Sequence, residues 1–160
     1  QDYTPYELRS VGALVRLGRP VRALAMLDFF FGDRRPAGWN QWAEVVMRGH
    51  REPRFLGDMP HAWVASDAIR SLLDLFVHDE GDALVLGAGL PEAWLGGAGV
   101  AVRALPTPGG PLSYRMKRGP GGLQVDIDAG LQPPPGGLKV RWHGREQRID
   151  RLPASVTLED

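Results

Sequence analysis

The residues best suited to chemistry lie in one stretch of the chain, residues 39–61. It contains two indole rings, Trp39 and Trp42, three carboxylates, Glu44, Glu52 and Asp58, and the imidazoles of His50 and His61. Carboxylates and imidazoles transfer protons, and indole rings offer flat apolar faces with one polar N–H. Residues 38–60 show neither a helical nor a strand period. Loops of this length are usually functional or disordered, and disordered segments are poor in aromatic residues. We therefore interpret the stretch as an ordered, functional loop.

Most of these residues also have a purely structural interpretation. Trp39 and Trp42 either form a platform for a sugar ring or pack as a core beneath the loop. Asp58 either accepts a hydrogen bond from a substrate or only favours the positive end of the following helix. His61 is either a site residue or a helix-start residue that bonds to the loop, and the second interpretation is favoured.

For Glu44 the structural alternative is an ion pair with one of three arginines of the same loop. These arginines are Arg48, Arg51 and Arg54. Motif matches of this kind are hypotheses, so both interpretations stay open at the level of sequence.

Three helices are expected to position this loop. The first starts at Thr4 with a capping box and ends at Gly18, and the second follows over residues 20–31. The third is predicted from about Pro60, with an apolar stripe that should face the core. Its members are Trp63, Ile69, Leu72, Leu73, Phe76 and Val77, while Asp67, Arg70 and Asp74 are expected off the stripe.

From residue 83 the hydrophobic period changes to two, which predicts strands. Turn-forming Gly and Pro clusters separate the strands, and such spacing suggests an antiparallel β-sandwich. The predicted class is α+β, with a helical part over residues 1–80 (residues 78–82 ending it) and a sandwich over residues 81–160. The seven candidate strands are 83–88, 100–105, 112–118, 123–128, 138–143, 145–150 and 155–159.

The composition excludes some classes of function. The chain has 19 Lys and Arg against 19 Asp and Glu, so the basic footprint of a nucleic-acid-binding domain is missing. No apolar run approaches the ~20 residues that a membrane-spanning helix needs, and the absence of cysteine excludes thiolate metal ligands. Asp126 and Asp128 share one strand face, which we interpret as a solvated face. We expect no metal and no cofactor.

The order of segments resembles the C-terminal end of bacterial (α/α)6-barrel glycoside hydrolases, the six-hairpin glycosidases, including α-L-rhamnosidase-like enzymes. The resemblance rests on WNQWAE, on GDMPHAW and on a pattern at the start of the strand region, and it covers essentially the whole chain. That pattern comprises Leu84 to Leu86, Pro91, Trp94, Val100, Val102, Leu105, Thr107 and Gly109. One departure is that Glu44 lies two residues after Trp42, where the family typically has Glu next to Trp.

The resemblance implies hydrolysis of glycosidic bonds in oligo- or polysaccharides. Glu44 would be a catalytic carboxylate acting as general base, and Trp39, Trp42, Asp58 and His61 would bind the carbohydrate. Because such a barrel has six helical hairpins, the chain is expected to be one portion of a longer enzyme and to be incomplete as an active site. A periplasmic or secreted location would follow, although no signal peptide begins this chain. The alternative is a non-catalytic carbohydrate-binding or structural module.

The second helix is apolar almost all round, which predicts a covering partner. Leu24, Leu27, Phe30 and Phe31 should not all be covered by two neighbouring helices. The partner would be the missing N-terminal barrel segment or a second chain.

Overall fold

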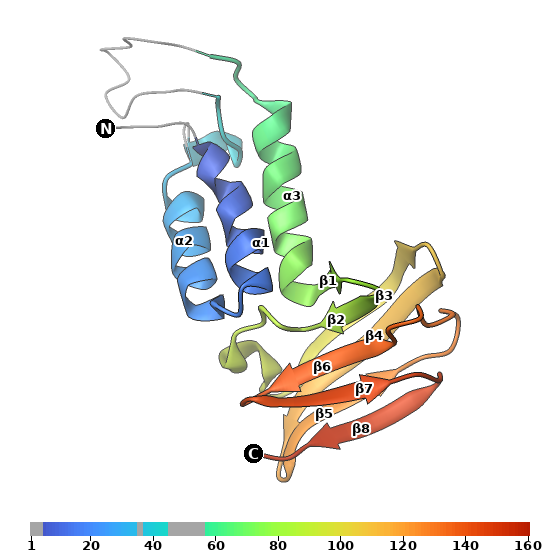
Figure 1. Ribbon diagram of the computed structural model, residues 1–160. Coiled ribbons are helices and arrows are strands. Elements are labelled where there is room, and N and C mark those ends of the chain that lie inside the picture. The colour runs from blue at the N-terminus through green and yellow to red at the C-terminus, as the bar shows by residue number, and fades with distance from the viewer. Residues whose placement is uncertain (1–4, 35–36, 45–56) are drawn as a thin grey trace. The chain divides into compact units, whose positions relative to one another are not determined.

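The chain folds into two compact units, Gln1–Asp74 and Leu75–Asp160. The computed structural model describes residues 5–34, 37–44 and 57–160 (Figure 1). Helices make up the first unit and two β-sheets the second, so the predicted α+β class is confirmed. The units divide at residue 74 and not at 80, because the first strand already begins at Val77.

The described residues of the helical unit form three α-helices and two short 3-10 helices. They are η1 (Pro5–Leu8), α1 (Arg9–Arg16), α2 (Pro20–Gly32), η2 (Ala37–Trp39) and α3 (Ala62–Phe76). Gly18, at φ 67°, ends α1 in a Schellman motif, since the amides of Gly18 and Arg19 donate to the carbonyls of Val15 and Leu14. Pro20 then opens α2 at the position where a missing N–H costs nothing. Thr4, the predicted cap, lies outside the described residues.

Small and polar residues join α1 to α3. A Cβ at Gly12 would lie 2.2 Å from the Asp74 carboxylate, so only glycine allows this approach. Asp74 is buried and accepts a hydrogen bond of 2.7 Å from Arg16. The Ser71 hydroxyl donates to the Leu8 carbonyl at 2.7 Å.

The predicted stripe of α3 is wrong in half of its members, since Leu72, Phe76 and Val77 are half-buried but the other three are exposed. Trp63, Ile69 and Leu73 are 70%, 61% and 41% exposed. The buried face instead carries residues spaced by three or four, and it includes Asp74, which was expected off the core face: Val64, Ala68, Ser71, Asp74 and Leu75. The physical reason is the close approach of α1, which selects small side chains and paired polar groups over large apolar ones.

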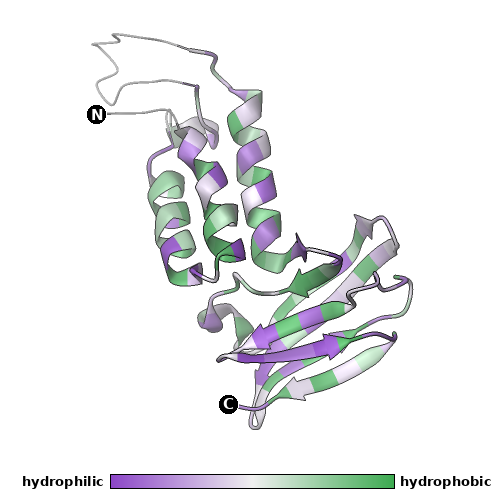
Figure 2. Cartoon of the chain, in the orientation of Figure 1, coloured by the Kyte–Doolittle hydropathy of each residue, from purple (hydrophilic) through white to green (hydrophobic). Residues whose placement is uncertain are grey.

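The four residues of α2 that predicted a covering partner are covered to different extents. Figure 2 shows α2 coloured mostly as hydrophobic. Leu27 and Phe30 are nevertheless buried within the helical unit, and Leu24 and Phe31 are half-buried. The exposed apolar residues of this hairpin are others, namely Leu17, Val21 and Phe29.

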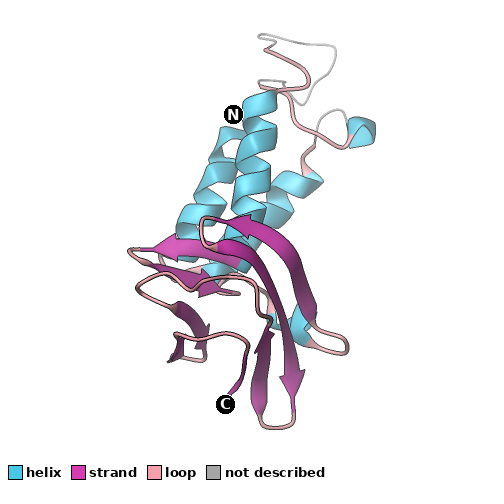
Figure 3. Cartoon of the chain, turned by 90° about the vertical axis from the view of Figure 1, so that its right-hand side faces the viewer, coloured by secondary structure: helices cyan, strands magenta, loops and turns pink. Residues whose placement is uncertain are grey.

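The second unit consists of two four-stranded sheets and the 3-10 helix η3 (Glu92–Leu95). The strand order is β1-β2-β6-β7 in one sheet and β3-β4-β5-β8 in the other (magenta in Figure 3). The strands are β1 (Val77–Glu80), β2 (Ala83–Leu86), β3 (Val100–Thr107), β4 (Gly110–Gly119), β5 (Gly122–Ile127), β6 (Leu138–Trp142), β7 (Arg145–Ile149) and β8 (Ala154–Leu158). All seven predicted strands are present with shifts of at most two residues at their ends.

Two features of the sheets differ from the prediction. Residues 78–80, expected to end the helical part, form β1, which pairs with β2 through a two-residue turn in which Gly81 has φ 62°. The pair β2 and β6 is parallel, whereas every other pair is antiparallel. Sequence spacing does not reveal parallel pairing, because the two strands are far apart along the chain.

The core of this unit lies between the sheets. In β5, Leu123, Val125 and Ile127 are buried and the intervening side chains are not, as the alternation predicts. Met116 of β4 lies against Gly87, directly after β2, so side chains of one sheet contact the other. The Tyr114 hydroxyl donates to the Phe76 carbonyl at 2.7 Å, and burial raises the pKa of this phenol far above its usual range.

Candidate functional site

Backbone pairing brings the two ends of the 38–60 loop together. The Glu44 N–H donates to the Asp58 carbonyl at 2.8 Å, and the His61 N–H donates to the Trp42 carbonyl at 3.2 Å. The Asp58 N–H in turn donates to Oε2 of the Glu44 side chain at 3.3 Å. Three residues that are separated in sequence therefore meet directly before α3.

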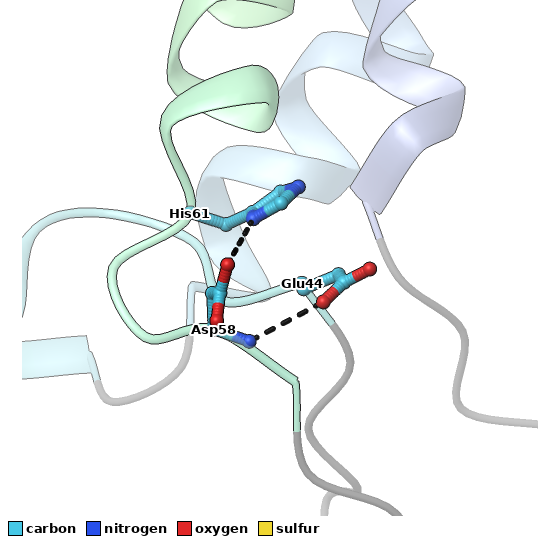
Figure 4. A group of neighbouring side chains, drawn as sticks. All are labelled: Glu44, Asp58 and His61. Atoms are coloured by element: carbon cyan, nitrogen blue, oxygen red, sulfur yellow. Dashed lines mark hydrogen bonds and ion pairs between the residues drawn. The ribbon is translucent and has the colours of Figure 1, made fainter.

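Figure 4 shows these three side chains, Glu44, Asp58 and His61, converging. The His61 Nδ1 lies 3.7 Å from Oδ2 of Asp58. One ligand atom of each residue falls within 4.8 Å of the other two. The His61 side chain is 9% exposed and that of Asp58 is 81% exposed, so the cluster has a buried side and a side open to solvent.

Tyr6 of η1 completes the cluster. Its hydroxyl lies 3.3 Å from Oε1 of Glu44, to which it donates, and 2.7 Å from Nε2 of His61. The two rings meet edge to face with centroids 5.5 Å apart. Desolvation, followed by the negative charge of Glu44, raises the pKa of Tyr6, so the phenol keeps its proton at neutral pH. Sequence reasoning missed Tyr6, since neither spacing nor motif connects it to the loop.

Gly57 fixes the position of the Glu44 side chain. A Cβ at Gly57 would lie 2.5 Å from Oε2 and 2.7 Å from Cβ of Glu44. The two segments therefore pack so tightly that any larger residue at 57 must displace the carboxylate.

Trp42 packs in the core, which was the structural alternative to its role as a sugar platform. It is 9% exposed, its indole N–H donates to the Phe30 carbonyl at 2.9 Å, and its ring meets Phe31 edge to face. Little of its face is left for a sugar. Trp39, the other tryptophan proposed as a platform, lies on η2 and is 55% exposed.

Trp63 is a second residue that the sequence analysis missed as a site residue, because it was assigned to the core. Its ring centroid lies 5.8 Å from that of His61, and the side chain is largely exposed. An exposed indole next to the cluster is the kind of surface that packs against a sugar ring. The signal available in the sequence was the GDMPHAW motif, which places Trp63 two residues after His61.

The other residues considered from the sequence are three arginines of the loop and Asp126 of β5. Arg48, Arg51 and Arg54, the proposed ion-pair partners of Glu44, lie outside the described residues. Asp126 is exposed and accepts a hydrogen bond of 2.5 Å from Ser155, which fits the solvated face expected for it.

The strand-rich unit has a cavity of its own, of about 430 Å³. Its walls include the carboxylate residues Asp79 and Asp82, Leu84 and Leu131, and the prolines of residues 133–135. This volume lies within the range of small-molecule pockets.

No protein-family model, curated protein sequence or solved structure matches this chain. Within the described part of the chain, no helix has both the length and the apolar character needed to cross a bilayer.

Proposed function

We propose that this chain is the C-terminal portion of a glycoside hydrolase and that Glu44 is its general base. The observation that carries the proposal is the fixed Glu44 carboxylate, with Tyr6 donating to one oxygen and the Asp58 amide to the other. The resemblance to six-hairpin glycosidases supports the same residue. Glycoside hydrolysis uses a carboxylate of this kind, held opposite a second carboxyl group.

In this reaction Glu44 would take a proton from a water molecule as the water attacks the sugar. Hydrogen bonds from Tyr6 and from the Asp58 amide hold the carboxylate in one orientation. Less conformational entropy is then lost when the transition state forms. His61 holds Tyr6 in place from the other side. Trp63 would supply the apolar face against which a pyranose ring packs.

Asp58 does not suit the role of the partner acid. The two carboxyl groups of a glycosidase flank the scissile bond, at ~6.5–9.5 Å in inverting enzymes. Asp58 and Glu44 lie on paired neighbouring segments, with ligand atoms within 4.8 Å. A sugar does not fit between them, so we propose that the acid comes from a further barrel segment or a second chain.

The test is the substitution Glu44→Gln in the complete enzyme, with hydrolysis and carbohydrate binding measured separately. We expect kcat to fall by about 10²–10⁴-fold while the affinity measured by calorimetry is retained. Glu7→Gln, which changes an exposed residue of η1, is the matched control and should leave both unchanged. Unchanged hydrolysis by the Glu44→Gln variant would remove the catalytic assignment.

The alternative, a carbohydrate-binding module without catalysis, makes a different prediction. Trp63→Ala and Glu44→Gln would then weaken binding to a similar extent, and the complete protein would release no sugar. The observation that supports this alternative is the exposed Trp63 next to hydrogen-bonding carboxylates.

A further inference from the structure

The hydrogen bonds of Tyr6 fit the tautomer of His61 in which Nε2 carries the proton. An ionised carboxylate only accepts, so Tyr6 gives its single O–H proton to Glu44. Its oxygen lone pairs then accept from Nε2 of His61, 2.7 Å away, in the tautomer in which Nε2 carries the proton. In the neutral imidazole the other nitrogen, Nδ1, therefore carries a lone pair.

That lone pair faces a second acceptor. Nδ1 lies 3.7 Å from Oδ2 of Asp58. One ring nitrogen of His61 and one oxygen each of Glu44 and Asp58 lie within 4.8 Å of one another. Among the described residues, no lysine or arginine forms an ion pair with Glu44 or Asp58. Two carboxylates and a ring nitrogen of His61 therefore lie close together (Figure 4), and this set of donors suits a cation.

The dimensions of this space suit a small divalent ion. Three atoms that lie within 4.8 Å of one another have a common centre at most about 2.8 Å from each. Zinc binds histidine nitrogen and carboxylate oxygen at ~2.0–2.2 Å, so shifts of about 0.7 Å or less bring all three to bonding distance. The donor set of one nitrogen and two oxygens suits zinc and its neighbours in the first transition row.

The surroundings have the organisation of a metal centre. The nitrogen of a ligating histidine that does not bind the metal usually donates to an oxygen, and in this tautomer Nε2 donates to the Tyr6 hydroxyl, 2.7 Å away. That same hydroxyl holds Glu44, so one phenol orients two ligands. Asp58 is 81% exposed and gives an ion a route from solvent.

We propose that Glu44, Asp58 and His61 bind one divalent transition-metal ion, with Nδ1 of His61 as the nitrogen ligand and Tyr6 as the residue that orients the ligands. This goes beyond the proposed hydrolytic role, and it competes with that role, because an ion that holds Glu44 removes it as a base. Zinc should therefore inhibit the complete enzyme if the proposed function is also correct.

The test is calorimetric titration of the full 160-residue chain with Zn²⁺, together with Co²⁺ as a probe whose visible absorption reports coordination. We expect one ion per chain. Asp58→Asn is the decisive variant, since its side chain is exposed and the substitution does not disturb a core. It should weaken Zn²⁺ binding by tenfold or more, as should Glu44→Gln and His61→Gln in variants whose circular dichroism is unchanged.

Two further variants separate this site from non-specific binding. Tyr6→Phe keeps all three ligands and should weaken binding by about 10–100-fold through lost orientation. His143→Gln is the matched control, since His143 also lies near a carboxylate, Asp160, at 3.9 Å, and its loss should leave binding unchanged. Absence of binding at millimolar Zn²⁺, or equal binding by the Asp58→Asn variant, would overturn the proposal whether or not hydrolysis is observed.

Discussion

The two units of this chain treat their large apolar side chains differently. Among the described residues of the strand-rich unit, Trp94 is the one large apolar residue that is substantially exposed. The helical unit exposes many more: Leu17, Val21, Phe29, Trp39, Met59, Trp63, Ile69 and Leu73. The sheets therefore satisfy their own core, whereas the helices present apolar surface together with the polar cluster at Glu44.

The largest expected effect tests whether the helical unit has a real core of its own. Trp42→Ala removes a buried indole that bonds to Phe30 and packs on Phe31, and it should cost about 3–5 kcal/mol. Trp39→Ala, at an exposed position, should change stability by less than about 0.5 kcal/mol. Hydrogen exchange measured peptide by peptide would report the loss in the helical unit. Equal effects of the two substitutions would contradict the placement of Trp42.

The next prediction compares tight glycine positions in the two units. At Gly122 of β5, φ is 128° and a Cβ would lie 2.1 Å from the Leu158 carbonyl, which is backbone. At Gly12 of α1, a Cβ would meet the end of the Asp74 side chain. Gly122→Ala should therefore destabilise by about 3 kcal/mol or more, and Gly12→Ala by about 1–3 kcal/mol. Chemical denaturation of both variants checks the order, and the reverse order would show that the helical unit is the more rigid one.

A pH dependence is expected from the strand-rich unit. Hydrogen bonds from Arg141 and then Lys139 lower the pKa of Glu80 to about 2, below the ordinary value of 4.5. The folded state binds this proton less readily than the unfolded chain does, so the stabilisation is present above pH 4.5 and is lost as the pH falls toward 2. Since Glu80 is more than a third exposed, solvent screening holds the contribution to about 1 kcal/mol.

Glu80→Gln should accordingly lower stability at neutral pH and flatten its decline in acid, as measured by urea unfolding between pH 2 and pH 7. Glu146→Gln, which removes a different partner of Arg141, serves as the control. An unchanged acid decline in the Glu80→Gln variant would show that other carboxylates dominate.

The smallest expected effect concerns the exposed face of α3. Ile69→Asn should change the free energy of unfolding by no more than about 0.5 kcal/mol, because the side chain is 61% exposed. The same substitution should reduce any self-association of the chain, measured by sedimentation velocity. The matched substitution Ala68→Asn, on the buried face of the same helix, should instead destabilise strongly. A large loss of stability from Ile69→Asn would mean that this face is covered.

The sequence by itself determined the local structure. Period-two alternation and Gly–Pro turns locate seven strands, and the Gly18–Pro20 junction locates the boundary between the first two helices, because these signals depend on neighbouring residues alone. The cluster of carboxylates and imidazole was also visible as residue types in one loop. What sequence did not reveal was which of these residues touch.

Tertiary structure decided the contacts that depend on distant segments. The approach of Gly12 to Asp74 selects the buried face of α3 and leaves Trp63 outside. Pairing of β2 with β6 creates the parallel register, and the position of η1 brings Tyr6 to Glu44 and His61. Each of these contacts joins residues far apart in the chain, and hydrophobic periodicity, which records only the spacing within one segment, contains no information about them.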